Sequence, residues 1–175
     1  MFGKTFDTRI LPCIFTSANL FFGFLAIIFA MDHHLRSAAG MILLSVLMDS
    51  LDGKVARKLK ASSDFGKELD SLSDVISFGL APAVLIYVFV YQNHWPLWGA
   101  LVSGLFTLCG ALRLARFNIL CSTDYFVGVP ITFAGGFMAL LLLFFDRIPW
   151  EVYPVAMSVL AVLMVSSLQV PKLGK

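Results

Sequence analysis

The chain of 175 residues is too hydrophobic and too poor in charge for a soluble globular protein. Apolar residues make up 59% of it and charged residues 14%, with a mean hydropathy of +0.87, whereas soluble domains are roughly half apolar and about a quarter charged. The net charge of +2 indicates no nucleic-acid partner, and the three cysteines lack the spacing of a disulfide framework or a zinc site. We therefore predict one domain, residues 1–175, of an all-α membrane protein.

Six apolar segments are each long enough for a membrane-spanning helix, which needs about 20 residues. In chain order, we expect these helices at residues 11–31, 36–59, 68–90, 95–118, 127–145 and 150–169. The first apolar run is longer than the core of a signal peptide, which has about 7–15 residues. We therefore expect this run to be retained as a span.

Lysine and arginine are distributed unequally between the two sides of this arrangement. Cytoplasmic loops of membrane proteins carry an excess of these residues. With both termini in the cytoplasm, only Arg36 and Arg147 of the 13 Lys and Arg residues lie on the outer side. The sequence thus predicts a polytopic protein of the inner cell membrane with six transmembrane helices, both termini cytoplasmic, and residues 49–74 at the cytoplasmic face.

Residues 49–74 join the second and third predicted helices and concentrate acidic side chains. At 3.6 residues per turn, small and acidic residues share one face of each helix: Asp49, Asp52, Gly53 and Ala56 on the second, and Gly66, Asp70 and Asp74 on the third. Residues 61–64 have the composition of a tight turn with helix-capping side chains. An antiparallel hairpin would therefore bring the two acidic faces together.

Four carboxylates in one small space repel one another, so protons or cations must compensate their charge. A site with only oxygen ligands favours a hard divalent ion such as Mg²⁺ or Mn²⁺. Two such ions would suit in-line displacement at phosphorus. The small side chains of Gly53, Ala56 and Gly66 would let a nucleotide lie against the backbone, and Arg57 can bind phosphate oxygens.

The spacing from Asp49 to Asp74, D-x2-D-G-x2-A-R-x8-G-x3-D-x3-D, matches the signature of the CDP-alcohol phosphotransferase family at all eight fixed positions, and the chain resembles that family. The resemblance implies a six-helix membrane fold, usually a homodimer, that transfers a substituted phosphate group from a CDP-linked donor to an alcohol and releases CMP. It implies that Asp74 is the catalytic base. By the same resemblance, two divalent cations, Mg²⁺ or Mn²⁺, would be bound by Asp49, Asp52, Asp70 and Asp74. The CDP pocket would be lined by Asp52, Gly53, Ala56, Arg57 and Gly66.

Two further stretches are similar to the phosphatidylserine synthase branch of that family. Residues 11–23, LPCIFTSANLFFG, resemble the branch pattern LPNxFTxxNLFxG, and residues 113–118, RLARFN, are followed by FVGVP at 126–130. The chain departs from the branch at Cys13, where Asn is usual, and at Thr132, where a second proline is common. The branch implies CDP-diacylglycerol and L-serine as substrates within a lipid bilayer.

The acceptor alcohol is expected to lie near the cytoplasmic end of the fourth helix. We expect contacts to the acceptor or to a lipid phosphate from Asn19, Arg113, Arg116 and Asn118. Alternatively, the arginines anchor the helix to lipid head groups and Asn19 joins two helices. Glycerol 3-phosphate or inositol phosphate could replace serine as acceptor. A protein that transports cations is an alternative from a different functional class. Its carboxylates would lie near the middle of the membrane-spanning helices, whereas the aspartates here are expected at helix ends.

Overall fold

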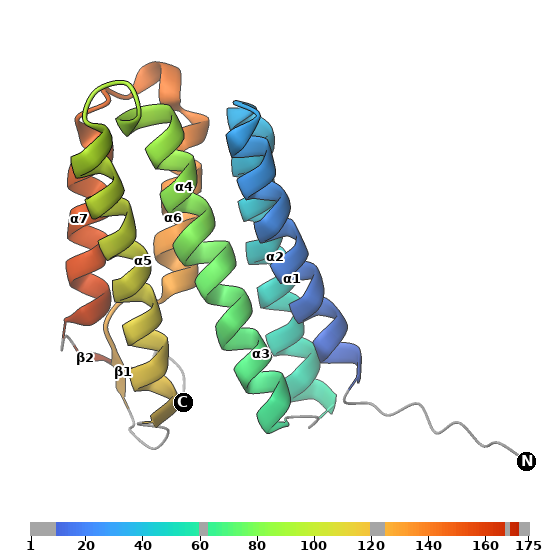
Figure 1. The fold of residues 1–175 in the computed structure, drawn as a ribbon. Helices are drawn as coiled ribbons and strands as arrows, with labels where there is room; N and C mark the ends of the chain where they lie inside the picture. The colour runs from blue at the N-terminus through green and yellow to red at the C-terminus, as the bar shows by residue number, and fades with distance from the viewer. Residues whose placement is uncertain (1–9, 60–62, 120–124, 167–168, 172–175) are drawn as a thin grey trace, which may run out of the picture.

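The computed structural model describes residues 10–59, 63–119, 125–166 and 169–171. Within these ranges the chain forms six helical rods and one pair of short strands (Figure 1). The rods are α1 (Ile10–Met31), α2 (Leu35–Leu59), the continuous series α3 (Asp64–Asp74), η1 (Val75–Leu80), α4 (Ala81–Ile86) and η2 (Tyr87–Tyr91), then α5 (Pro96–Ile119), α6 (Ile131–Leu143) and α7 (Val152–Val165). A single turn, η3 (Phe145–Arg147), follows α6. The predicted helical class is confirmed.

The strand pair corrects the limits predicted for the last two helices. β1 (Tyr125–Val127) pairs antiparallel with β2 (Gln169–Pro171), so neither segment belongs to a helix. After β1, Gly128 has a φ of 75°, and a Cβ there would collide with the Met164 carbonyl at the end of α7. Only glycine fits this close, left-handed turn. Because the strand and this turn precede the helix, α6 begins at Ile131, four residues later than the sequence indicated.

Three of the described rods are long and apolar enough to cross a membrane, namely residues 12–31, 64–91 and 96–119. The outer faces of α1, α5 and α7 carry exposed apolar side chains, such as Phe21, Leu97 and Val162. At the end of the bundle away from β1 and β2, Arg36 and Asp146 form an ion pair with N and O atoms 3.7 Å apart. An apolar exterior with charges at the ends is typical of an integral membrane protein.

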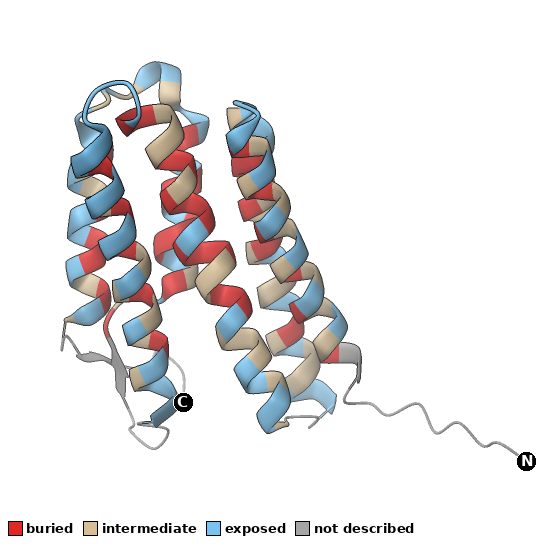
Figure 2. Cartoon of the chain, viewed as in Figure 1, coloured by how far each residue is buried: buried red, intermediate tan, exposed pale blue. Residues whose placement is uncertain are grey.

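The rod of residues 64–91 occupies the centre of the bundle (Figure 2). In its most apolar stretch 61% of the residues are buried, against 28% in α1 and 22% in α5. It packs against α1, α2, α5 and α6. In the second half of α3, Asp70 is half-buried and Asp74 is buried between the helices, whereas Asp64 and Glu68 nearer its start are exposed.

Regular α-helical hydrogen bonding is interrupted in this central rod directly after Asp74. Residues 75–80 form a π-helical turn, in which the N–H of Ala81 bonds to the carbonyl of Ile76, five residues earlier. Pro82 has no N–H to donate to the carbonyl of Phe78, and this carbonyl faces Gly135 of α6 so closely that a Cβ on Gly135 would collide with it. The proline explains the local irregularity, and the glycine lets α6 approach it.

Candidate active site

Three aspartates meet where the end of α2 lies against α3. Asp49 of α2 and Asp70 and Asp74 of α3 each offer one carboxylate oxygen, and these oxygens all lie within 4.8 Å of one another. Asp74 is buried and the other two are half-buried. The helical spacing in the sequence predicted opposed acidic faces, and the structure brings these three acids together.

The start of α3 is set by a side-chain cap. Ser63 has an extended backbone, with φ −130° and ψ 153°, and its hydroxyl accepts a 3.0 Å hydrogen bond from the N–H of Gly66. This bond satisfies one of the free N–H groups at the helix terminus. The predicted capping turn is confirmed at Ser63, whereas residues 60–62 lie outside the described ranges. With the helix start fixed, Asp70 and Asp74 are one turn apart on the same face.

The three-carboxylate cluster suits a hard divalent cation. Oxygen ligands lie about 2.0–2.6 Å from Mg²⁺ or Ca²⁺, so two ligands of one ion are at most about 4–5 Å apart, and the 4.8 Å limit meets this condition. Oδ1 of Asp70 is buried without a hydrogen-bond partner in the described part of the chain. A buried carboxylate oxygen without a donor calls for a cation. The donor set therefore fits a divalent metal ion.

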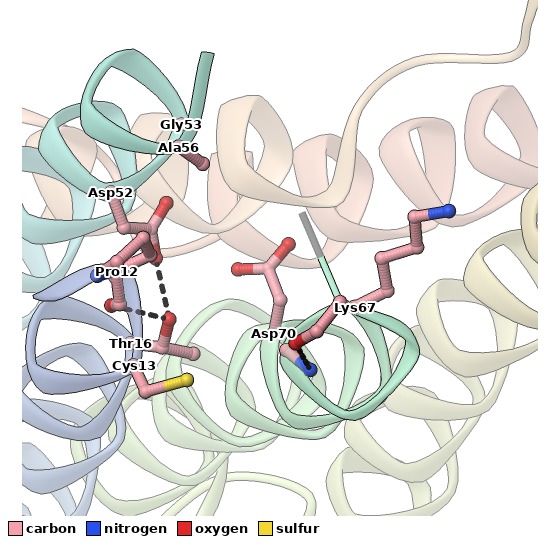
Figure 3. A pocket seen from close by; sticks show the side chains of 10 residues that line it. Pro12, Cys13, Thr16, Asp52, Gly53, Ala56, Lys67 and Asp70 are labelled. Carbon is pink, nitrogen blue, oxygen red and sulfur yellow. Dashed lines mark hydrogen bonds between the residues drawn. The ribbon is translucent and has the colours of Figure 1, made fainter. Parts of the chain in front are cut away.

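The fourth aspartate, Asp52, lies beside this cluster in a pocket between α1, α2 and α3 (Figure 3). Asp52 and Asp70 approach the pocket from opposite helices. The complete lining is Pro12, Cys13, Thr16, Asp52, Gly53, Ala56, Ser63, Gly66, Lys67 and Asp70. Among the described residues, no other group lies within 4 Å of the position a Cβ would take on Gly53. The pocket thus combines two carboxylates with open space beside Gly53.

A second cavity, of about 510 Å³, opens on the other side of α3. Asp70, Asp74, Arg113 and Asn118 are among its lining residues, and Pro130 borders it where α6 begins. Asp70 lines both cavities, and so does Lys67. The volume is within the range of small-molecule sites. The acidic cluster therefore lies between two cavities and is accessible from each.

Comparison with known proteins agrees with this arrangement. Residues 9–168 match the family model described as CDP-alcohol phosphatidyltransferase. The chain belongs to this family. This membership confirms the resemblance seen in the sequence, and the aspartates, the two cavities and the bundle can be interpreted as parts of a CDP-alcohol phosphatidyltransferase.

Curated relatives in the family share most of the chain. It is 40% identical to a CDP-diacylglycerol–serine O-phosphatidyltransferase of Bacillus subtilis, over 94% of this chain and 92% of that protein. A protein of the same name from Helicobacter pylori is 37% identical, over 94% of this chain and 73% of its own length. An archaetidylserine synthase of Methanothermobacter thermautotrophicus is 42% identical, over 93% of this chain and 70% of its own length.

The family signature residues are placed unequally around the first pocket. Asp52, Gly53, Ala56 and Gly66 line it. Arg57 is exposed and does not line it in the described residues; its Nε donates a 3.0 Å hydrogen bond to the carbonyl of Gly53. The guanidinium thus lies next to the pocket rim, one turn along α2.

The four residues predicted to contact the acceptor or a lipid phosphate occupy three different places. Arg113 and Asn118 line the second cavity; Nε of Arg113 is buried without a partner among the described residues, and Asn118 donates to the Ser71 hydroxyl at 3.0 Å. Arg116 donates to the carbonyl of Val165 in α7 at 3.3 Å. Asn19 is buried beneath the cluster, where its amide donates to Oδ1 of Asp74 at 3.2 Å.

Two threonines that support the aspartates were missed in the sequence. The hydroxyl of Thr16 in α1 donates to Oδ2 of Asp52 at 3.0 Å, and the side chain of Thr132 in α6 lies near Asp49. Thr16 and Asn19 are three residues apart on an otherwise apolar helix, and this polar stripe was a signal that could have revealed them. Thr132 had no comparable signal.

Proposed function

We propose that this CDP-alcohol phosphatidyltransferase transfers a phosphatidyl group from CDP-diacylglycerol to the hydroxyl of L-serine, giving phosphatidylserine and CMP. The main support for this proposal is that the acidic cluster lies between two cavities. A displacement reaction with two substrates needs a binding site for each of them beside the reacting centre. The names of the relatives support serine as the acceptor. Two of the three relatives cited above are named as serine O-phosphatidyltransferases, and the third is named as an archaetidylserine synthase.

In this proposal the four aspartates hold two divalent cations, Mg²⁺ or Mn²⁺. Dependence on divalent cations is general in the family. Asp49, Asp70 and Asp74 supply the close cluster, and Asp52 faces Asp70 across the first pocket. Bound cations of this kind neutralise the carboxylates and stabilise negative charge on the phosphate oxygens. Asp70 is suited to serve both ions because it borders both cavities.

The first pocket is proposed to bind the cytidine diphosphate of the donor. The open space at Gly53 and the small side chain of Ala56 allow close approach of a nucleotide to α2. Arg57, held over the carbonyl of Gly53, would bind phosphate oxygens through its planar guanidinium. The acyl chains of the donor would remain in the bilayer beside the apolar outer face of the bundle.

The second cavity is proposed to bind serine. The buried Nε of Arg113 has no partner there among the described residues, which suits the carboxylate of the amino acid. Asp74 would accept the proton of the serine hydroxyl. As that oxygen forms its bond to the phosphorus of the phosphatidyl group, the bond from this phosphorus to the CMP oxygen breaks, and CMP departs through the first pocket. Asn118 would help to close the serine site.

The orientation proposed from the sequence places this reaction at the cytoplasmic face of the inner cell membrane. Both the start of α1 and the strand β2 lie at the end of the bundle that holds the aspartates (Figure 1). The start of α2, which carries Arg36, lies at the opposite end (Figure 1), and Arg36 is paired there with Asp146, the residue before Arg147. This placement supports six crossings with both termini in the cytoplasm, and we propose a homodimer as the assembled form.

The alternatives differ in the ligand that the cluster serves. Glycerol 3-phosphate or inositol phosphate would bring a phosphate group in place of the serine carboxylate, and the same cavity would have to neutralise its larger charge. A cation carrier would leave the space beside Gly53, which is open in the described part of the chain, without a use. The serine reaction accounts for the acids, the small residues and Arg113 together.

One assay separates these possibilities. The purified chain in lipid nanodiscs is supplied with CDP-diacylglycerol and Mn²⁺, and CMP release is compared for L-serine, glycerol 3-phosphate and inositol phosphate. We expect rapid release with serine and only background release with the other two. Faster release with either phosphorylated acceptor would contradict the serine assignment, and no release with any acceptor would contradict the enzymatic one.

A further inference from the structure

Asn19 is completely buried where α1, α2 and the central rod meet. Its side-chain amide donates a 3.2 Å hydrogen bond to Oδ1 of Asp74. Its backbone carbonyl accepts two hydroxyl hydrogen bonds, from Ser45 of α2 at 3.1 Å and from Ser77 of η1 at 2.9 Å. One residue of α1 is thus bound to both helices that carry the aspartates.

The backbone of Asn19 is held independently of its side chain. The hydroxyls of Ser45 and Ser77 bind only the main-chain carbonyl. One helical turn further along α1, a Cβ on Gly23 would collide with Ser77, so α1 and η1 are in close contact. Because these contacts need no carboxamide, packing alone does not explain why residue 19 has a polar side chain.

The orientation of the carboxamide favours Asp74 at the expense of the amide itself. With its NH₂ group directed to Asp74, Oδ1 of Asn19 is buried without a partner in the described part of the chain. An unsatisfied buried polar atom costs about 1–3 kcal/mol. A side chain serving only to join helices would be expected to satisfy both ends of its amide. The orientation of the Asn19 amide is explained if its hydrogen bond to Asp74 is needed for the function of Asp74.

A neutral amide is also the appropriate donor for a carboxylate in a cation site. Lysine or arginine at this position would neutralise Asp74 and repel an incoming divalent ion. An amide fixes one carboxylate oxygen and leaves the negative charge available. Groups that orient metal ligands in this way typically change metal affinity by about 10–100-fold when they are removed.

We infer that Asn19 is a positioning residue that holds Oδ1 of Asp74 and thereby sets how Asp74 faces the metal ions and the acceptor. This inference rests on the proposed function, because it gives Asp74 a role in that reaction. It differs from the contact with acceptor or lipid phosphate that the sequence suggested for Asn19.

The test compares Asn19→Leu with Ser45→Ala in nanodiscs. Leucine has a side chain branched at the same atom and keeps the backbone carbonyl of residue 19 but removes the donor to Asp74. Alanine at position 45 removes a hydrogen bond to the same residue and leaves that donor in place. Mn²⁺ affinity is measured by electron paramagnetic resonance without substrates, and the thermal unfolding midpoint is recorded for each variant. For Asn19→Leu we expect Mn²⁺ affinity to fall about 10–100-fold, and we expect CMP release to recover partly at high Mn²⁺ concentration. For Ser45→Ala we expect a lower unfolding midpoint and unchanged Mn²⁺ affinity.

If Asn19→Leu does not fold, Asn19→Ala replaces it under the same criteria. A folded variant at position 19 that binds Mn²⁺ as the wild type does would overturn the inference, as would equal losses of affinity in Ser45→Ala. Failure of the wild-type protein to bind Mn²⁺ or to release CMP would instead contradict the proposed function. The two failures are therefore distinguishable.

Discussion

The hydroxyl of Thr16 on α1 donates a 3.0 Å hydrogen bond to Oδ2 of Asp52 on α2. The same hydroxyl is 3.1 Å from the carbonyl of Pro12, and because it has a single proton, the two acceptors share or compete for it. The first helix thus stabilises an acid of the donor pocket without supplying a carboxylate of its own.

Removing this hydroxyl is expected to weaken catalysis while preserving the fold. Thr16→Val has nearly the same shape but cannot donate to Asp52, and we expect kcat/KM to fall about 10–100-fold, as for other groups that orient metal ligands. Thr16→Ser retains the hydroxyl and should recover most of the loss. Steady-state CMP release as a function of CDP-diacylglycerol gives both values. Equal activity of the valine and serine variants would show that the hydrogen bond is unimportant.

The space at Gly53 can be tested with a glycine elsewhere on α2. In the described part of the chain, a Cβ on Gly53 or on Gly40 would meet no other group within 4 Å, so a side chain added at either position starts in open space. Only Gly53 lines the donor pocket. We expect Gly53→Leu to lower kcat/KM for CDP-diacylglycerol about 100-fold, because it displaces the nucleotide from its reacting position. Gly40→Leu should leave this value nearly unchanged; similar losses in both variants would argue against a donor site at Gly53.

The two arginines at the end of α5 are expected to differ in function. Arg113 lines the second cavity, and its Nε has no hydrogen-bond partner in the part of the chain that the structure describes, whereas Arg116 donates to the carbonyl of Val165. A hydrogen bond to a charged group contributes about 1.5–3 kcal/mol, so Arg113→Ala should raise KM for serine by about 10–150-fold. Arg116→Ala should affect KM for serine much less and lower the thermal unfolding midpoint. A larger serine effect in Arg116→Ala would reverse the assignment.

The contact between the central rod and α6 predicts a large difference between two glycines. A Cβ on Gly135 would collide with the backbone of Phe78, whereas one on Gly104 would meet no other described residue within 4 Å. We expect Gly135→Ala to destabilise the bundle by about 1–3 kcal/mol through overpacking, and Gly104→Ala to have little effect. Thermal unfolding in nanodiscs measures the difference; a stable Gly135→Ala variant would mean that α6 can move away from Phe78.

The sequence was sufficient for features that depend on helix periodicity and on local composition. It placed the acids of α2 and α3 on facing surfaces, because a spacing of three or four residues fixes a helix face, and it located the capping turn at Ser63. Family membership also followed from the signature alone. These properties need no knowledge of which helices become neighbours.

Features that depend on tertiary contacts were not predicted. The sequence could not show that Thr16 binds Asp52 or that Thr132 lies near Asp49, because the partners belong to different helices. The sequence analysis also started the fifth helix too early, at Val127, because hydropathy cannot detect the left-handed turn at Gly128. The division of the site into two cavities, with Asp70 bordering both, arises only when α1 and α5 pack on opposite sides of α3.

The central claim is that the aspartates hold the divalent ions through which the phosphatidyl group is transferred. The most direct measurement is Mn²⁺-dependent CMP release from CDP-diacylglycerol and serine in Asp70→Asn, because Asp70 borders both cavities. The control is Asp146→Asn, which removes an exposed carboxylate at the other end of the bundle. We predict that the wild type and the control release CMP only when Mn²⁺ is present, and that Asp70→Asn releases none at any Mn²⁺ concentration. CMP release by Asp70→Asn at the wild-type rate, or by the wild type after complete removal of divalent ions, would contradict the account.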